Sequence, residues 1–154
     1  MGKKLLTRHL REVSSVKRSI HIEAPVEKVF DFVKDPRNVP EGVTMPYEVK
    51  DVRLTDEGVG TYYGWAVKTP GRRFEGFDVY TEFIPNQRIT DKSSWSVAGD
   101  WTYSFEPEGS GMKLTAESHS RSFWRVPLLR ELVESVKSRA SERLLSALKA
   151  QMEA

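Results

Sequence analysis

The chain has 154 residues, a formal net charge of +2 and no cysteine. This length suits one domain with its own core, and the balance of 38% hydrophobic and 30% charged residues excludes a disordered chain. The absence of cysteine excludes disulfides, zinc–thiolate sites, iron–sulfur clusters and cysteine nucleophiles, and it fits a reducing compartment.

Residues 1–14 form a basic, weakly amphipathic extension ahead of a domain over residues 15–154. The apolar stretch near the start stops at once, and no apolar run approaches the roughly 20 residues of a membrane span, so a cytoplasmic protein is predicted. A frayed or docked terminal helix is the simpler interpretation of the extension. Contact with a membrane surface or a ribosome is the alternative. The small net charge gives no basic stripe, so nucleic acid is not predicted as a partner.

Periodicity divides the rest of the chain. Val16–Glu23 alternates like a half-buried strand, and Pro25 then opens a short helix that ends at Asp35-Pro36. A loop or second short helix follows through Pro40–Pro46. Six more strands, each bounded by turn residues, are Tyr47–Leu54, Thr61–Lys68, Arg73–Phe83, Arg88–Val97, Trp101–Phe105 and Lys113–Ser122. Their short connections make neighbouring strands antiparallel.

A long helix over Pro127–Met152 completes the chain. Its predicted apolar stripe consists of Leu129, Leu132, Val133, Val136, Ala140, Leu144, Ala147 and Leu148. A sheet with one amphipathic helix to cover must curl around it. The predicted fold is therefore α+β, a helix-grip arrangement in which a curved antiparallel sheet of about seven strands surrounds the C-terminal helix, with short helices between strands 1 and 2.

Alternation along the strands predicts which side chains face that helix. Asp78 and Glu82 are assigned to water, which fixes the phase of their strand. The predicted inner face consists of Thr61, Tyr63, Trp65 and Val67; Arg73, Glu75, Phe77, Val79, Thr81 and Phe83; Ile89, Asp91, Ser93, Trp95 and Val97; Trp101, Tyr103 and Phe105; and Leu114, Ala116, Ser118, Ser120 and Ser122.

This inner face mixes large aromatic side chains with serines and charged groups. Burying unpaired polar groups costs several kcal/mol, so a cavity filled by water or ligand fits better than a dry core. Mostly apolar walls with a few polar groups are typical of small-molecule sites. In the alternative, Arg73 and Glu75 are solvated at a strand end and the aromatic residues form a solid core.

Three motifs follow one another along the chain: Ile20–Phe30, Asp35–Asn38 and Trp101–Leu114. In this order, and with the terminal helix, they resemble the START-like or SRPBCC superfamily, which has the helix-grip fold. The resemblance begins at about Ser15, reaches the end of the chain and is greatest for bacterial polyketide cyclase/dehydrase-like proteins. It implies a cavity between the sheet and the C-terminal helix. Relatives include cyclases, aromatases and carriers of lipids, sterols or quinones, so the fold does not fix the function.

The predicted function is binding or carrying a small hydrophobic, ring-containing molecule that is lipid-, quinone- or polyketide-like. The predicted ligand contacts are Tyr63, Trp65, Phe77, Val79, Thr81, Ser93, Trp95, Trp101, Tyr103, Ser118, Ser120, Leu132, Val136 and Ala140. The alternative is a polyketide cyclase or aromatase. In that case Arg73 or Tyr103 would stabilise an enolate, and Glu75 or Asp91 would act as the base.

Other chemistries find no support in the motifs. Gly58-Val59-Gly60 lacks the third glycine at dinucleotide-binding spacing, and Phe77 stands where a phosphate-binding loop needs lysine. The resemblance makes the first and last strands neighbours, so His21 and His119 are expected side by side on the outer face. A solvated pair is the simpler interpretation and a metal site the lesser one. No metal and no cofactor are predicted, and both a monomer and a homodimer remain open.

Overall fold

The computed structural model describes residues 13–38, 47–94, 99–121 and 127–154. Its strands are β1 (Val13–Ile22), β2 (Tyr47–Arg53), β3 (Tyr62–Thr69), β4 (Arg72–Ile84), β5 (Arg88–Ser93), β6 (Asp100–Glu108) and β7 (Gly111–Arg121). Its helices are α2 (Val26–Val33), the single turn η1 (Pro36–Asn38) and α3 (Pro127–Glu153). The predicted α+β class, the strands and the long helix are confirmed. The extension lies outside the described residues except for its last two, which belong to β1.

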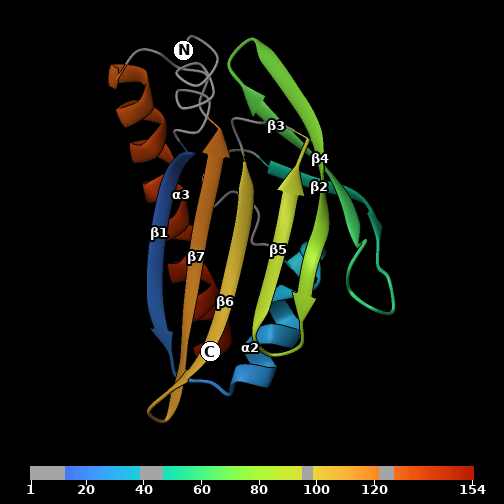
Figure 1. Ribbon diagram of the computed structural model, residues 1–154, viewed down its shortest axis with the longest axis vertical. Helices are drawn as coiled ribbons and strands as arrows, with labels where there is room; N and C mark the ends of the chain where they lie inside the picture. Colours follow the sequence, from blue (N-terminus) through green and yellow to red (C-terminus); the bar gives the residue numbers. More distant parts are fainter. Residues whose placement is uncertain (1–12, 39–46, 95–98, 122–126) are drawn as a thin grey trace, which may run out of the picture.

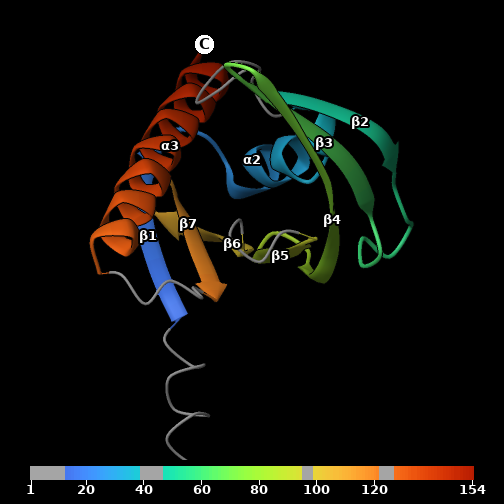
Figure 2. The same cartoon turned by 90° about the horizontal axis from the view of Figure 1, so that it is seen from above.

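All seven strands form one antiparallel sheet in the order β1-β7-β6-β5-β4-β3-β2. The chain therefore runs as a meander from β2 to β7, and β1 joins beside β7 to complete the sheet. Seen from above, the sheet curves, with α3 along its β1 edge and α2 inside the curve (Figure 2). The predicted helix-grip arrangement is confirmed (Figure 1).

Helix α2 is anchored on the concave face by aromatic contacts. The Phe30 ring meets Phe83 at 5.2 Å and Phe105 at 5.1 Å between centroids, both edge-on. Tyr80 donates a hydrogen bond to the Lys34 carbonyl at 3.1 Å, just past the end of the helix. These contacts from two strands, β4 and β6, hold α2 against the concave face of the sheet.

Helix α3 buries a face that differs from the predicted stripe. Lys137, Ser141, Leu145, Leu148 and Met152 follow at spacings of three and four residues, and the last four are buried. At about 100° per residue, Leu132 and Val136 lie well round the helix from this face, and their side chains are 60% and 53% exposed. The prediction was wrong there because Lys137 and Ser141, which are polar, occupy inward positions. Half-buried Ala140 lies at the margin.

The prediction of which residues face inward in the first part of β4 is also wrong. Asp78 and Tyr80 are buried, whereas Arg73, Glu75, Phe77 and Thr81 are exposed. The reason is a β-bulge: Tyr80 pairs with Asp91 but Glu82 pairs with Thr90, so Thr81 is an extra residue. Strict alternation counted back from Phe83 therefore assigns every earlier residue to the opposite face.

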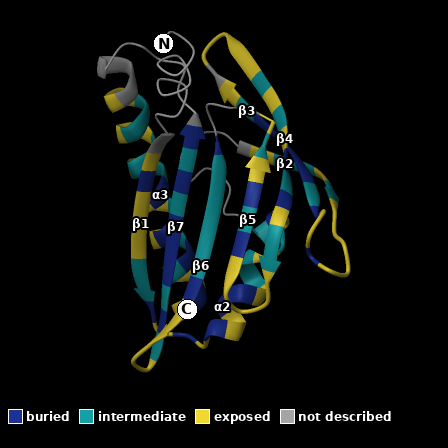
Figure 3. Cartoon of the chain, viewed as in Figure 1, coloured by how far each residue is buried: buried dark blue, intermediate teal, exposed yellow. Residues whose placement is uncertain are grey.

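Burial is most continuous along β7, the strand beside β1 (Figure 3). On β7, alternate residues from Met112 to Ser120 are all buried, and they pack toward α2 and α3 together with Ile22 and Ile89. Among the described helices, none is both long and apolar enough to cross a membrane.

Candidate functional site

A pocket opens between the concave face of the sheet, α2 with η1, and the C-terminal half of α3. The helices contribute apolar side chains, and the strands contribute aromatic and acidic ones. The lining residues are Phe32, Val33, Pro36, Asn38, Tyr63, Tyr80, Ile89, Asp91, Tyr103, Leu144 and Leu148. The predicted location between sheet and C-terminal helix therefore holds, with α2 as a third wall.

The cavity volume is about 40 Å³. This is space for water molecules, whereas sites for small organic ligands usually measure about 300–1,000 Å³. A ring-sized molecule therefore enters only if lining side chains move. A shift of the helices is the more accessible movement, because the backbone of each lining strand is hydrogen-bonded to a neighbouring strand on both sides.

Two carboxyl groups lie close together on the strand side of the pocket. Asp91 is part of the lining, and Asp78 is not. Tyr63 Oη is 3.0 Å from Asp78 Oδ2 and 3.2 Å from Asp91 Oδ2, so the phenol bridges both. Trp65 Nε1–H donates to Asp78 Oδ1 at 2.9 Å. Asp91 is 4% exposed, and its Oδ1 has no hydrogen-bond partner among the described residues.

Burial is the largest cause of the pKa shifts of Asp78 and Asp91. It raises the pKa of Asp78, against the hydrogen bonds that Trp65, Tyr63 and Ser93 give to the carboxylate. It raises the pKa of Asp91 well above the usual value, and the neighbouring Asp78 charge raises it further. Asp91 is thus the group of the pair that holds a proton more tightly.

A glycine makes room for the indole that supports Asp78. Gly76 pairs with Trp65 across β3 and β4, and a Cβ at Gly76 would lie 2.3 Å from Trp65 Cζ2. Any side chain there would push the indole away, and with it the N–H that reaches Asp78.

The concave face carries a row of directly paired residues that crosses four strands. Tyr80, Asp91, Trp101 and Ser118 are successive partners from β4 to β7. At the far end of the row, Lys137 Nζ of α3 lies 3.4 Å from the buried Ser118 hydroxyl. Burial lowers the pKa of Lys137 to about 8, and nearby Glu134 opposes that shift. The row therefore has polar groups at both ends: the Tyr80 hydroxyl on β4, and the Ser118 hydroxyl with Lys137 at β7.

Most of the predicted inner-face residues do face inward. Tyr63 and Trp65 are buried, as are Asp91, Ser118 and Ser120, while Ser93, Trp101 and Tyr103 are half-buried on the same side. Tyr63, Asp91 and Tyr103 line the pocket. Contact of these residues with a ligand stays a prediction. Trp95 lies outside the described residues.

Other predicted site residues lie elsewhere. Arg73 is on the exposed outer face, where it forms ion pairs with Glu75 at 2.9 Å and Glu48 at 3.3 Å. This arrangement matches the solvated alternative for Arg73 and Glu75. Phe77 stacks on Tyr62 outside the sheet, with ring centroids 5.5 Å apart, and half-buried Val79 pairs with Tyr62 and Lys92. Neither Phe77, Val79 nor Thr81, nor Leu132, Val136 and Ala140 of α3, lines the pocket.

Several lining residues were not predicted as site residues. Tyr80 was missed because of the bulge, and Asp78 behind it because an acidic residue was assigned to water. Phe32, Val33, Pro36 and Asn38 come from the helical segment after β1, and the strand-by-strand assignment did not include that segment. The apolar Val33, identified as part of the short helix, was the signal available for this wall.

The expected pairing of His21 with His119 is wrong. His21 is opposite Lys113, whereas His119 is opposite Ser15, six positions along the same pair of strands. His119 Nε2 instead pairs with Glu117 at 2.8 Å. Among the described residues, no group of three or more His, Asp or Glu side chains is arranged to hold a metal ion.

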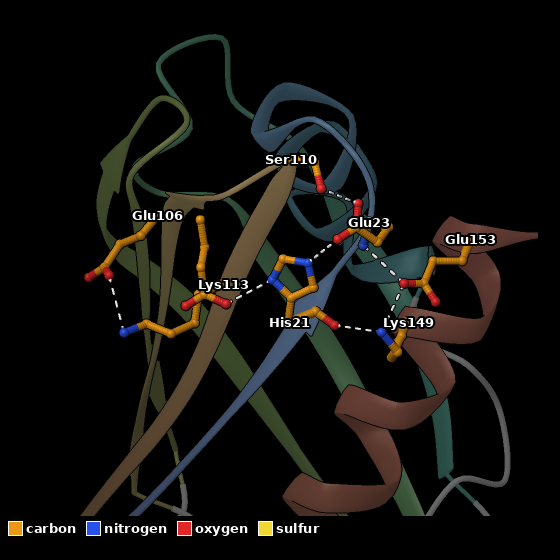
Figure 4. Close-up of polar contacts among 8 residues, drawn as sticks. His21, Glu23, Glu106, Ser110, Lys113, Lys149 and Glu153 are labelled. Atoms are coloured by element: carbon orange, nitrogen blue, oxygen red, sulfur yellow. Dashed lines mark hydrogen bonds and ion pairs between the residues drawn. The ribbon is translucent and has the colours of Figure 1, made fainter.

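His21 instead belongs to a polar cluster at the end of β1 (Figure 4). Its ring nitrogens contact Glu23 and, at 2.7 Å, Glu108. Lys149 of α3 donates to the His21 carbonyl at 2.7 Å, and the Glu23 amide donates to Glu153 at 2.9 Å. The cluster joins β1, the β6–β7 turn and the end of α3, which is a structural role.

Comparison with known proteins places this geometry in context. The family described as "Polyketide cyclase / dehydrase and lipid transport" matches residues 14–153. Among curated proteins, none matches this chain in sequence.

Solved structures share the fold at low sequence identity. A Thermus thermophilus protein, TTHA0849, is 23% identical with a TM-score of 0.66, over 90% of this chain and 96% of that one. CV1439 from Chromobacterium violaceum is 20% identical with a TM-score of 0.65, over 91% and 98%. StfQ, a di-domain ARO/CYC from the steffimycin biosynthetic pathway, is 17% identical with a TM-score of 0.72, over 98% of this chain and 53% of StfQ.

Proposed function

Since the chain belongs to the polyketide cyclase/dehydrase and lipid transport family, within the START-like superfamily, we propose that it binds or carries a small hydrophobic, ring-containing molecule in the pocket between sheet, α2 and α3. The observation that carries this proposal is the lining of the pocket. Apolar and aromatic side chains surround one buried carboxyl, Asp91. Apolar walls give affinity, and a few polar groups set the orientation of the ligand.

The small volume makes an expansion step part of the proposal. Leu144 and Leu148 project from α3 into the pocket, opposite Tyr63 and Tyr103 on the strands. When a ring displaces a leucine side chain, the free energy of binding must compensate for the packing contacts that the leucine loses. Removing that side chain in advance leaves the space ready, as with engineered apolar cavities that bind ring compounds.

This expansion predicts the effect of a truncation. Leu144→Ala is expected to bind a one-ring probe, toluene, roughly tenfold more tightly than the unaltered protein, equivalent to about 1.4 kcal/mol. The control is Val136→Ala, on an exposed position of the same helix, which should leave the affinity unchanged. Titration followed by NMR chemical shifts measures both. Equal effects of the two variants would count against this pocket as the binding site.

Identifying the natural ligand needs protein purified from its source cells. Native mass spectrometry is expected to show an apolar molecule bound at one copy per chain. Failure to bind any member of a broad panel of lipids, quinones and aromatic compounds would overturn the binding proposal.

A cyclase or aromatase is the second candidate, and one observation favours it. Asp91 lines the pocket with a raised pKa, which suits a group that exchanges protons with a bound chain, and Tyr103 lies in the same lining. Arg73 and Glu75, the other two candidates, lie on the outer face and not in the lining of this pocket. Incubation with a polyketide synthase and its chain tests this reading. An unchanged product distribution with and without the protein would argue against catalysis.

A further inference from the structure

The contacts of Tyr63 limit how the two buried carboxyls can be charged. A phenol carries one proton and therefore donates one full hydrogen bond at a time. Tyr63 Oη nevertheless lies within hydrogen-bond distance of both Asp78 Oδ2 and Asp91 Oδ2. The second contact is a full hydrogen bond only if one of the carboxyls supplies the proton.

The donors around Asp78 identify it as the charged member. Trp65 donates to Oδ1, and Tyr63 reaches Oδ2. Asp91 is buried more deeply, and its Oδ1 has no partner among the described residues. Two buried negative charges this close together would be costly, because no cation among the described lining residues balances either of them.

In the part of the chain that the structure describes, no cation faces Asp91. The polar groups that face it are Tyr63 on β3, Asp78 and Tyr80 on β4, and Tyr103, Asp100 and the backbone N–H of Trp101 on β6. Helices α2 and α3 contribute Phe32, Val33, Leu144 and Leu148, and η1 contributes uncharged Asn38. Lys137 contacts Ser118, two strands away from β5.

We propose that Asp91 carries a proton that it donates through Oδ2 to Tyr63, and that its Oδ1, which is buried until the pocket expands, accepts a hydrogen bond from a hydroxyl group on the ligand. This inference rests on the proposed binding function and names the class of ligand: a neutral ring compound with a phenolic, enolic or alcoholic O–H. A ligand with only an ether or ketone oxygen has no proton to donate, so Oδ1 stays unpaired. An anionic ligand is repelled by the negative charge of Asp78.

The first test follows the carboxyl groups directly. Carbon-13 NMR of the full chain at pH 6 should show Asp91 in the protonated form and Asp78 ionised. Asp91→Asn identifies the Asp91 resonance by removing it. At this pH an aspartate with the ordinary pKa near 3.9 is almost fully ionised, so the two forms are well separated. Two ionised carboxyls would overturn the proposal.

The second test compares matched probes. 4-Methylphenol should bind roughly tenfold more tightly than 4-methylanisole, which has the same ring but no O–H, and 4-methylbenzoate should bind most weakly. Asp91→Asn keeps a neutral carbonyl at this position and should keep the preference for the phenol. Asp91→Leu, which has no acceptor, should lose it. An equal preference in the leucine variant would overturn the proposal.

The two proposals fail in different ways. If the unaltered protein binds neither the phenol nor the ether, the binding function itself fails, and ligand selection fails with it. If it binds both equally well, the pocket stands and only the role of Asp91 is wrong. Should Asp91→Leu not fold, the carbon-13 measurement and the asparagine variant still decide the outcome.

Discussion

His21 shows how a single exposed residue can join three elements. Its ring nitrogens contact Glu23 and Glu108. Its backbone carbonyl accepts a hydrogen bond from Lys149 of α3 (Figure 4). The hydrogen bonds to Glu23 and Glu108 raise the pKa of the imidazole above its usual value. A raised histidine pKa means that folding favours the charged form.

This linkage predicts a pH-dependent contribution to stability. The contribution of the imidazolium is complete below the ordinary pKa of 6.5 and is lost as the pH rises through the raised value. The loss of unfolding free energy caused by His21→Gln should therefore be larger at pH 5.5 than at pH 9. Urea unfolding at both values measures it.

His119→Gln is the matched control, since the ion pair of His119 among the described residues is with Glu117 of its own strand. It should cost little stability at either pH. If the cost of His21→Gln were the same at pH 5.5 and pH 9, the imidazolium would not be the stabilising form.

At the scale of the element, α3 packs with a face that includes polar residues. Ser141 is buried and donates to the Lys137 carbonyl one turn earlier, at 2.9 Å, so its hydroxyl is satisfied within the helix. Leucines at positions 132 and 145 are chemically identical, but the first is 60% exposed and the second 2%.

Alanine substitutions at these two leucines test which face of α3 packs against the rest of the protein. Leu145→Ala should lower the free energy of unfolding by about 2–5 kcal/mol, because it leaves a cavity in the core. Leu132→Ala should change it by no more than about 0.5 kcal/mol, since a surface side chain loses little packing. Denaturant unfolding gives both values, and similar losses would show that the helix packs with another face.

How far the elements could be predicted depends on what fixes their faces. Strands β3, β5, β6 and β7 alternate regularly, so their inward residues followed from the pattern. On α3, hydrophobicity favoured Val136 over Lys137, although the lysine faces inward with its amine near Ser118. Asp78 was assigned to water for the same reason. Hydrogen bonds from distant residues, here Trp65 and Tyr63, reverse such assignments, and no local pattern contains them.

At the scale of the whole molecule, the strands of the curved sheet are unequally supported. Strand β7 lies between β1 and β6 and buries its inward residues, whereas β2 is the last strand and pairs only with β3. A register shift between Lys50 and Arg53, with Asp51 at a positive φ of 54°, further interrupts the pairing of β2. Local stability should therefore fall across the sheet from β7 to β2.

Hydrogen exchange measures this gradient. Amides of β7 are expected to exchange orders of magnitude more slowly than those of β2, because local opening energies range from near zero at weak edges to the global value in the core. Equal protection of β2 and β7 would mean that the sheet opens only as a unit.

The order of the elements and the curved sheet could be predicted because turns, prolines and periodicity act locally. The position of the pocket could be predicted, but not all of its lining residues, because they come from α2, η1, four strands and α3. The position of Asp91 followed from alternation, whereas its partnership with Asp78 depends on the bulge at Thr81.

The bulge also bears on evolutionary comparison. Solved structures with this fold share 14–23% of aligned residues with the chain, so their alignment depends on where single-residue gaps fall. A homologue whose corresponding strand is regular aligns correctly only with its gap opposite Thr81. If the gap is placed elsewhere, Asp78 and Tyr80 are matched with residues of the opposite face. Any transfer of residue roles between such homologues across β4 would then be wrong by one position.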